Sequence, residues 1–162
     1  MRRLFLDANV LFTAAHNPAG KAALVIEEGI RGRWALVTSR LAVDEATHNL
    51  RLKYPEVLPR LEPLLAAARV LPHRATRSCP VELPARDRPI LRAALDCRAT
   101  HLLTGDLTHF GPYVNRPELV EGLVIQTVGD FLRSLTETRG PTDNPGSLLP
   151  MVARFACATF CT

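Results

Sequence analysis

Short apolar runs alternate with helical patterns along most of the chain. An unbroken apolar run that stops at a polar residue is typical of a strand buried on both faces of a parallel sheet. Apolar residues three or four positions apart, with charged residues between them, predict helices that could cover such a sheet. The predicted strands are residues 3–7, 34–38, 70–71, 101–104 and 124–127, and the predicted helices are residues 21–30, 39–53, 56–68, 87–98 and 129–135.

This alternation of strands and helices predicts the class of fold. Parallel strands need crossover connections, and helical crossovers cover both faces of the sheet. We therefore expect an α/β domain with three layers, α/β/α, around a central, mainly parallel sheet. Local signals support two of the helix starts: Ser39 can cap the helix that follows it, and Asp87 can cap a helix that has Pro89 in its first turn.

The composition changes towards the C-terminus. The 162 residues suffice for one domain, which we expect to span residues 1–138. Residues 139–147 are rich in Gly, Pro and polar residues, and predict a linker. Residues 148–162 form an apolar tail with a single charged residue, Arg154. This tail is either a helix that docks on the domain or on a partner, or a poorly ordered extension. No apolar stretch approaches the roughly 18 residues of a membrane span, so we expect no membrane contact.

The net charge is +4, and its composition is more informative than its size. Lys21 and Lys53 are the two lysines, so nearly all cationic residues are arginine. Arginine forks onto phosphate, which favours a nucleic-acid partner. A GC-rich coding sequence would produce the same bias, and the charge alone leaves both explanations open. The four cysteines contain no CxxC pair, which is typical of reduced thiols in a cytoplasmic protein.

Four acids stand at positions that predict a metal site. Asp7 and Asp106 each end an apolar strand, Asp87 begins a helix, and Glu45 lies inside one. The carboxyl ends of the strands form the ligand crevice of an open α/β sheet. Carboxylates gathered there repel each other unless cations hold them, and Mg²⁺ or Mn²⁺ prefers such oxygen ligands. A divalent-metal site of this kind is suited to phosphodiester hydrolysis.

Each acid also has a simpler interpretation. Asp7 could be a surface acid at a strand end, Asp87 only a helix cap, and Asp106 only a turn residue after a glycine. Glu45 has an acidic neighbour, Asp44, and an acid in a helix is usually solvated. Successive helix residues point about 100° apart, so these two cannot share one role equally. The four acids together are more specific than any one of them.

The order and spacing of these residues resemble the PIN domain, a nuclease fold that includes the VapC-type toxins of bacterial toxin–antitoxin pairs. The resemblance covers about residues 3–135 and is most specific in its last two segments. It favours Glu45 over Asp44. The matching segments are Phe5-Leu6-Asp7-Ala8-Asn9-Val10-Leu11, Thr38-Ser39 with Glu45, Leu83-Pro84-Ala85-Arg86-Asp87-Arg88-Pro89-Ile90-Leu91, and Leu102-Leu103-Thr104-Gly105-Asp106-Leu107-Thr108-His109-Phe110.

The resemblance implies a ribonuclease that depends on Mg²⁺ or Mn²⁺. In that reading Asp7, Asp87 and Asp106 bind the metal directly or through water, and Glu45 completes the site or orients the attacking water. Hydrogen bonds from three further residues would shape the acid pocket. Those residues are Asn9, Ser39 and Thr104.

Two positions near the last aspartate leave alternatives open. In many relatives a further acid follows that aspartate by two residues, and here the position is Thr108, which allows a site with one metal. His109 either contacts phosphate or acts as an acid, or it packs beside Phe110. The candidate RNA contacts are arginines near the acids, namely Arg40, Arg86, Arg88 and Arg92, with Arg74 and Arg77 in the loop before them.

The resemblance also implies partners. A toxin of this kind cleaves an RNA substrate and is held by a small antitoxin protein. A homodimer is expected through the apolar tail or through the helices at residues 21–30 and 56–68. The alternative is a PIN-like module that binds RNA or protein without turnover. A phosphoacceptor receiver domain would need a late lysine, and a haloacid-dehalogenase-type phosphatase would need an aspartate where the chain has Asn9.

Overall fold

A five-stranded parallel sheet forms the centre of the described structure, a computed structural model that describes residues 1–74 and 78–137. The strands are β1 (Arg3–Leu6), β2 (Ala35–Ser39), β3 (Ala68–Leu71), β4 (His101–Leu103) and β5 (Val124–Gln126), and their order in the sheet is β3-β2-β1-β4-β5. All neighbouring pairs are parallel. Strand β1 lies in the middle, and its residues Leu4, Phe5 and Leu6 are fully buried. This burial explains the unbroken apolar run that precedes Asp7.

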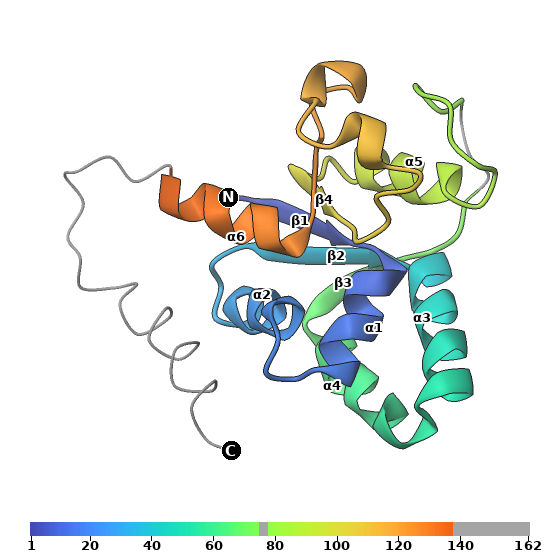
Figure 1. Ribbon diagram of the computed structural model, residues 1–162, viewed down its shortest axis with the longest axis vertical. Coiled ribbons are helices and arrows are strands. Elements are labelled where there is room, and N and C mark those ends of the chain that lie inside the picture. Colours follow the sequence, from blue (N-terminus) through green and yellow to red (C-terminus); the bar gives the residue numbers. More distant parts are fainter. Residues whose placement is uncertain (75–77, 138–162) are drawn as a thin grey trace. The chain divides into compact units, whose positions relative to one another are not determined.

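Helices cover the sheet on both sides (Figure 1). Helices α1 (Ala8–His16), α2 (Lys21–Ile30), α3 (Arg40–Lys53) and α4 (Leu61–Ala66) lie on one face, and α5 (Arg88–Asp96) lies on the other. The expected three-layer α/β/α architecture around a parallel sheet is therefore confirmed. Short 3₁₀ turns complete this part of the chain: η1 (Pro55–Arg60), η2 (Gly111–Tyr113) and η3 (Pro117–Leu119).

The chain divides into two units, Met1–Phe131 and Leu132–Thr162. The sheet and all the candidate site residues belong to the first unit. Helix α6 (Val128–Glu137) begins in it, and the buried Phe131 ring packs edge-on against Trp34 with 5.2 Å between ring centroids. The predicted linker at 139–147 and tail at 148–162 lie outside the described residues. In the part of the chain that the structure describes, no helix combines the length and apolar character needed to cross a membrane.

Two helical regions differ from the sequence prediction. The run after Asp7 is helix α1, although its apolar residues were not predicted to be helical. Five of its nine residues are buried, and its polar residues Asn9, Thr13 and His16 recur at helical spacing, so the helical period was present in the sequence but was not recognised. The helix expected at 56–68 is instead divided into η1 and α4. Pro59 lies inside η1, and a proline there lacks the backbone donor that a continuous α-helix requires.

Hydrogen bonds tie the carboxyl end of β1 to both of its neighbours. The Thr38 hydroxyl of β2 donates to the Leu6 carbonyl at 2.8 Å. On the other side, the backbone N–H of Asp7 donates to the Leu103 carbonyl at 3.1 Å. These bonds fix Asp7 at the edge of the sheet where β1, β2 and β4 end together. That edge is the expected place for a ligand site in this class of fold.

Candidate active site

Asp7 is the buried member of the acid cluster. Its side chain is buried, with 7% of the residue exposed, and one carboxylate oxygen accepts a 2.7 Å hydrogen bond from the backbone N–H of Ala8 at the start of α1. The other oxygen accepts from the Thr104 hydroxyl at 2.7 Å and from the Asn9 amide at 3.2 Å. Burial raises the pKa of Asp7, and the Thr104 and Ala8 bonds oppose that rise. The nearby charges of Glu45 and Asp87 raise this pKa further.

Asn9 and Thr104 join the ends of β1 and β4. The Asn9 amide nitrogen also lies 3.2 Å from the Thr104 hydroxyl oxygen, and its amide oxygen accepts from the backbone N–H of Gly105 at 2.6 Å. The Thr104 hydroxyl in turn accepts from the backbone N–H of Asp106 at 3.1 Å. A short polar network therefore runs from Asp7 to Asp106. It fixes two carboxylates that are 99 positions apart in the chain.

Asp106 sits in a tight turn after β4. One carboxylate oxygen accepts from the backbone N–H groups of Thr108 at 3.0 Å and His109 at 3.2 Å, and the other lies 2.8 Å from His109 Nδ1. Burial works to raise the pKa of Asp106, but the bonds from the side chain and backbone of His109 outweigh it. The net pKa is lowered. Asp106 therefore stays ionised at lower pH than an ordinary aspartate.

Asp87 immediately precedes α5, but its side chain does not cap that helix. It makes no capping hydrogen bond, so the expected cap bond is absent. One carboxylate oxygen lies 3.1 Å from His109 Nδ1 and accepts no hydrogen bond of good geometry within the described residues. Burial raises the pKa of Asp87, the charges of His109 and Arg86 oppose the rise, and the charge of Asp106 adds to it. Asp87 therefore faces the acid cluster rather than its own helix.

His109 lies between the two aspartates. Its Nδ1 atom is within 3.1 Å of an oxygen of each, which places the ring at the acid cluster, while the neighbouring Phe110 is fully buried. The alternative in which His109 only packs beside Phe110 does not describe this geometry. In the sequence, the signal for this position of His109 was that it follows Asp106 by three residues across a tight turn.

Glu45 and Asp44 differ in their surroundings. Asp44 is exposed and pairs with Arg40 of the same helix at 3.1 Å. Glu45 is also exposed, and its charge raises the pKa of the buried Asp7. Ser39 caps α3 by accepting from the backbone N–H of Ala42 at 3.2 Å. That cap fixes the first turns of the helix that carries Glu45.

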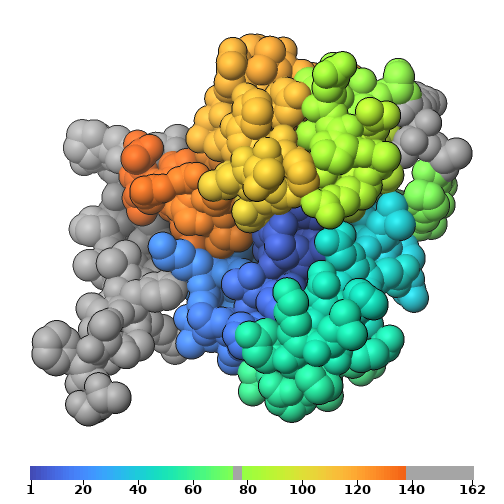
Figure 2. All heavy atoms as spheres, turned by 45° about the vertical axis from the view of Figure 1, so that its right-hand side comes forward, coloured from blue at the N-terminus to red at the C-terminus, as the bar shows by residue number. Residues whose placement is uncertain are grey.

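The cluster as a whole can accommodate a cation. Asp87, Asp106 and His109 each offer one ligand atom, and these atoms lie within 4.8 Å of one another. The incompletely satisfied Asp87 oxygen and the mutual repulsion of the carboxylates suit a divalent ion. In Figure 2 the start of the chain, in dark blue, emerges where segments near residues 40–50, 85–90 and 105–110 meet. The residues present thus fit the Mg²⁺ or Mn²⁺ ion that was expected.

The candidate RNA-contacting arginines have different partners. Arg86 is 72% exposed at its side chain and lies 3.8 Å from Asp87, so it is beside the site. Arg88 donates to the Leu83 carbonyl at 2.7 Å and holds the loop before α5. Arg92 is mostly buried and pairs with Asp96 at 2.8 Å. Arg40 forms the exposed pair with Asp44, and Arg77 lies outside the described residues.

Comparison with known proteins supports the fold. No protein-family profile matches the chain, and no curated protein sequence matches it. A similar solved structure is the crystal structure of VapBC2 from Rickettsia felis bound to a DNA fragment from their promoter. The match has a TM-score of 0.56 and 12% identity, and it covers 77% of this chain and 98% of the other chain. At this identity the similarity shows a shared fold, in agreement with the PIN-like architecture.

Proposed function

We propose that this protein is a metal-dependent endoribonuclease, and that it is the toxin of a toxin–antitoxin pair. The observation that carries the proposal is the meeting of Asp7, Asp87, Asp106 and His109 at the carboxyl edge of a parallel sheet. Glu45 joins them through its charge on Asp7. Carboxylates that raise one another's pKa are unfavourable neighbours. Acids with pKa values shifted in this way are concentrated at functional sites.

The proposed division of work follows from the environments of the acids. Asp87, Asp106 and His109 hold the metal, and the buried Asp7 carboxylate completes the site. Thr104, Asn9 and Ala8 keep the Asp7 carboxylate in one orientation. When bound, Mg²⁺ or Mn²⁺ lowers the pKa of a water and neutralises the charge that develops on the phosphate. The exposed Glu45 carboxylate is placed to accept a proton from, or to orient, the attacking water.

The test is cleavage of labelled structured RNAs and of single-stranded DNA with Mn²⁺, Mg²⁺ or EDTA. Wild type is compared with Asp7→Asn, Asp106→Asn and the control Glu118→Gln, an exposed acid that pairs with Arg116 away from the cluster. We expect cutting of RNA that needs metal, is lost in the first two variants and persists in the control. Cutting that survives EDTA, or that both site variants retain, would reject the proposal.

A protein partner is the second part of the proposal. The similar structure is a VapBC2 complex, and we infer that a small antitoxin binds this chain and covers its acid cluster. To test this, the chain is co-expressed with the product of an adjacent small gene, and the two proteins are purified together. The antitoxin should suppress RNA cutting at a one-to-one ratio. A complex that leaves the cutting rate unchanged would place the partner elsewhere.

The expected homodimer is a separate proposal. Ile30 at the end of α2 is 59% exposed, which is consistent with a contact through this helix. Light scattering at high protein concentration measures the mass of the particle in solution. We expect the mass of two chains, and the mass of one chain at all concentrations would contradict the homodimer. This result does not bear on the nuclease.

A module that binds without turnover is the alternative, and one observation that favours it is the position of His109. A histidine that bridges Asp87 and Asp106 can partly satisfy them without a metal, and Thr108 stands where many relatives have a further acid. Titration with Mn²⁺ followed by calorimetry separates the two functions. Binding of metal with cutting supports the nuclease, whereas a folded protein that binds neither Mn²⁺ nor Mg²⁺ supports the module.

A further inference from the structure

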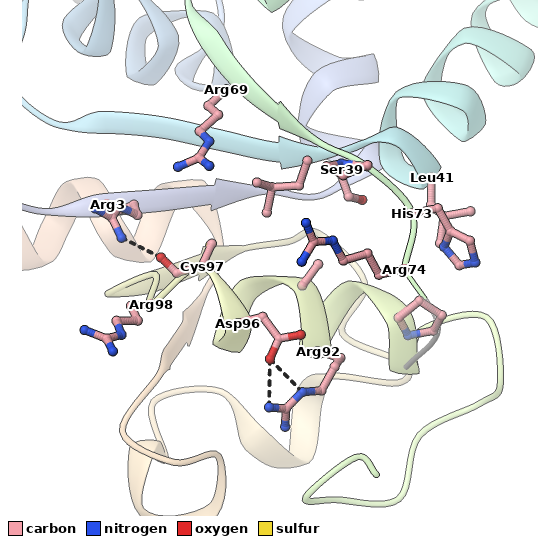
Figure 3. Close-up of a pocket in the computed structure, with 14 residues that line it drawn as sticks. Arg3, Ser39, Leu41, Arg69, His73, Arg74, Arg92, Asp96, Cys97 and Arg98 are labelled. Carbon is pink, nitrogen blue, oxygen red and sulfur yellow. Dashed lines mark hydrogen bonds and ion pairs between the residues drawn. The ribbon is translucent and has the colours of Figure 1, made fainter. Parts of the chain in front are cut away.

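We propose that an arginine-lined pocket between β3 and α5 binds the phosphates of the RNA strand next to the cleaved bond. The pocket has a volume of about 700 Å³. Its lining includes Arg3, Arg69, Arg74, Arg92 and Arg98 (Figure 3). The inference rests on the proposed nuclease function, and it adds the path of the substrate.

The sheet register explains why the arginines meet. Side chains of a strand alternate between its faces, and residues paired across parallel strands share a face. Val37 pairs with Phe5 of β1 and with Arg69 of β3. Arg3 lies two residues before Phe5, so Arg3 and Arg69 point to the same face. Helix α5 lies over this face, and residues of both β3 and α5 line the pocket (Figure 3).

The pocket carries positive charge that the protein itself does not neutralise. Asp96 is the acid in its lining, and Arg92 already pairs with it at 2.8 Å. None of the ion pairs within residues 1–74 and 78–137 includes Arg3, Arg69, Arg74 or Arg98. Clustered guanidinium groups repel one another unless an anion joins them. A phosphate accepts two hydrogen bonds from one guanidinium fork, which makes it a suitable anion.

One end of the pocket lies near the acid cluster. Ser39 lines it, and the bond from Thr38 to the Leu6 carbonyl brings Ser39 level with Asp7. Pro89, two residues after Asp87, also lines it. At the other end lie Arg3, near the start of β1, and Arg98, just past the end of α5. Nine helical residues span about 13 Å, which exceeds the size of one phosphate and suits a strand.

This placement favours RNA over an acidic peptide as the occupant. An RNA strand cut at the acid cluster must continue away from it, and the next phosphates need cations along that path. The described lining offers five guanidinium groups and a single imidazole, His73, but no Phe, Tyr or Trp on which successive bases could stack. We therefore expect contacts to the phosphates that depend little on base sequence.

The experiment compares two variants with the same loss of charge. The pocket variant is Arg69→Gln/Arg74→Gln/Arg98→Gln, and the control is Arg51→Gln/Arg60→Gln/Arg116→Gln, whose positions do not line the pocket. Binding of a fluorescent single-stranded RNA is measured by anisotropy in EDTA over a range of salt concentrations. Binding of poly-glutamate is measured in parallel, and cutting with Mn²⁺ is measured separately. Thermal unfolding checks that both variants are folded.

We expect the pocket variant to bind RNA at least about tenfold more weakly than the control, with a salt slope reduced by about 2, since each lost single-strand phosphate contact removes about 0.7. Equal affinities of the two variants would overturn the pocket as an RNA site, even if wild type cuts RNA. Selective loss of poly-glutamate binding alone would assign it to an acidic protein segment and also overturn the inference. Pocket-dependent RNA binding without cutting by wild type would reject the nuclease while leaving the pocket as an RNA site.

Discussion

Asp7 shows how one carboxylate can be buried and still be ready for a cation. Its pKa is raised by burial, and the hydrogen bonds from Thr104 and from the backbone N–H of Ala8 oppose that rise. The Thr104 hydroxyl is central because it donates to Asp7 and accepts from the backbone N–H of Asp106. Thr104 therefore acts on both strand-end aspartates, although it offers no charge of its own.

Replacing Thr104 by valine keeps the shape of the side chain and removes its hydroxyl. Asp7 then loses a donor in a buried place, so its pKa should rise further, and the free energy of unfolding should fall by about 1–3 kcal/mol. Urea unfolding in EDTA at pH 7 measures this change. Thr104→Ser keeps the hydroxyl and should lose only the roughly 0.8 kcal/mol of one methyl group. Equal losses in the two variants would show that packing, not the hydrogen bond, matters there.

His109 predicts a preference among metals. Transition-metal ions accept imidazole nitrogen more readily than Mg²⁺ does. In His109→Asn we expect the dissociation constant for Mn²⁺ to rise on the order of tenfold and that for Mg²⁺ to rise less. Calorimetric titration of both ions measures the difference. His16→Asn, in the last turn of α1, is the matched control. A loss that is equal for both ions would mean that His109 positions the aspartates but does not bind the metal.

His101 predicts how stability depends on pH. Burial, with a smaller effect from Arg2, lowers the pKa of His101 below its ordinary 6.5, and the ring packs against Phe131 at 5.1 Å. Below pH 6.5 the unfolded chain therefore takes up a proton before the folded one. As the pH is lowered below 6.5, the free energy of unfolding should fall by at most about 1.4 kcal/mol for each pH unit.

The comparison for His101 is urea unfolding of wild type and His101→Phe at pH 7.5 and 5.5. The raised pKa values of Asp7 and Asp87 act in the opposite direction, because their folded forms bind protons more tightly, so the difference between the two proteins isolates the histidine. We expect His101→Phe to lose less stability on acidification than wild type. An identical loss would assign the effect to other groups.

At the scale of elements, two helices start with an aspartate, but only one start is capped. Asp7 accepts from the backbone N–H of Ala8 and caps α1, whereas Asp87 leaves the start of α5 without a side-chain cap. A capping bond is worth roughly 1 kcal/mol, so α5 forgoes that stabilisation. The Asp87 carboxylate instead faces Asp106 and His109. A residue that departs from its local structural role is a mark of a functional site.

Opposite pKa shifts predict opposite effects of two similar substitutions. In EDTA at pH 7, Asp87→Asn should raise the free energy of unfolding by up to about 1 kcal/mol, because it removes a charge that folding disfavours. Asp106→Asn should lower it by about 1 kcal/mol, because the lowered pKa of Asp106 reports bonds to its charged form. Urea unfolding tests both variants. Destabilisation by Asp87→Asn would contradict this account of α5.

The elements also show what the sequence could and could not predict. Periodicity was sufficient for the five strands and for α2, α3 and α5, since each has a clear apolar face or run. Helix α1 was missed although its polar residues Asn9, Thr13 and His16 are helically spaced, because the short run Val10-Leu11-Phe12 was not recognised as part of a helix. The strand ends indicated Asp7 and Asp106 as site residues, and in the structure the Thr104 hydroxyl donates to the Asp7 carboxylate and accepts from the backbone N–H of Asp106. The bridging place of His109 and the pocket around Arg69 depend on contacts between distant segments, which no local pattern contains.

At the scale of the molecule, the topology brings distant residues together at the edge of the sheet. The order β3-β2-β1-β4-β5 places β1 between β2 and β4, so residues near positions 7, 39 and 104 become neighbours. The same order leaves β3 at an edge, and the arginine-lined pocket lies beside it. The carboxyl ends of parallel strands lie on the same side of the sheet, so acids that follow the strands gather there. The stability of the whole fold is therefore linked to what neutralises those acids.

That linkage predicts that a bound metal should stabilise the entire domain. An ion at about 100 times its dissociation constant adds about 2.7 kcal/mol, which raises the melting temperature by roughly 5–10 °C for a domain of this size. Scanning fluorimetry with Mn²⁺ and with EDTA measures the rise in wild type, in Asp106→Asn and in the surface control Asp96→Asn. We expect the rise in wild type and control and its loss in Asp106→Asn, because removing one charged ligand leaves too little charge to hold the ion. The same rise in all three proteins would place the stabilising metal outside the acid cluster. It would also remove the electrostatic reason for bringing these carboxylates together.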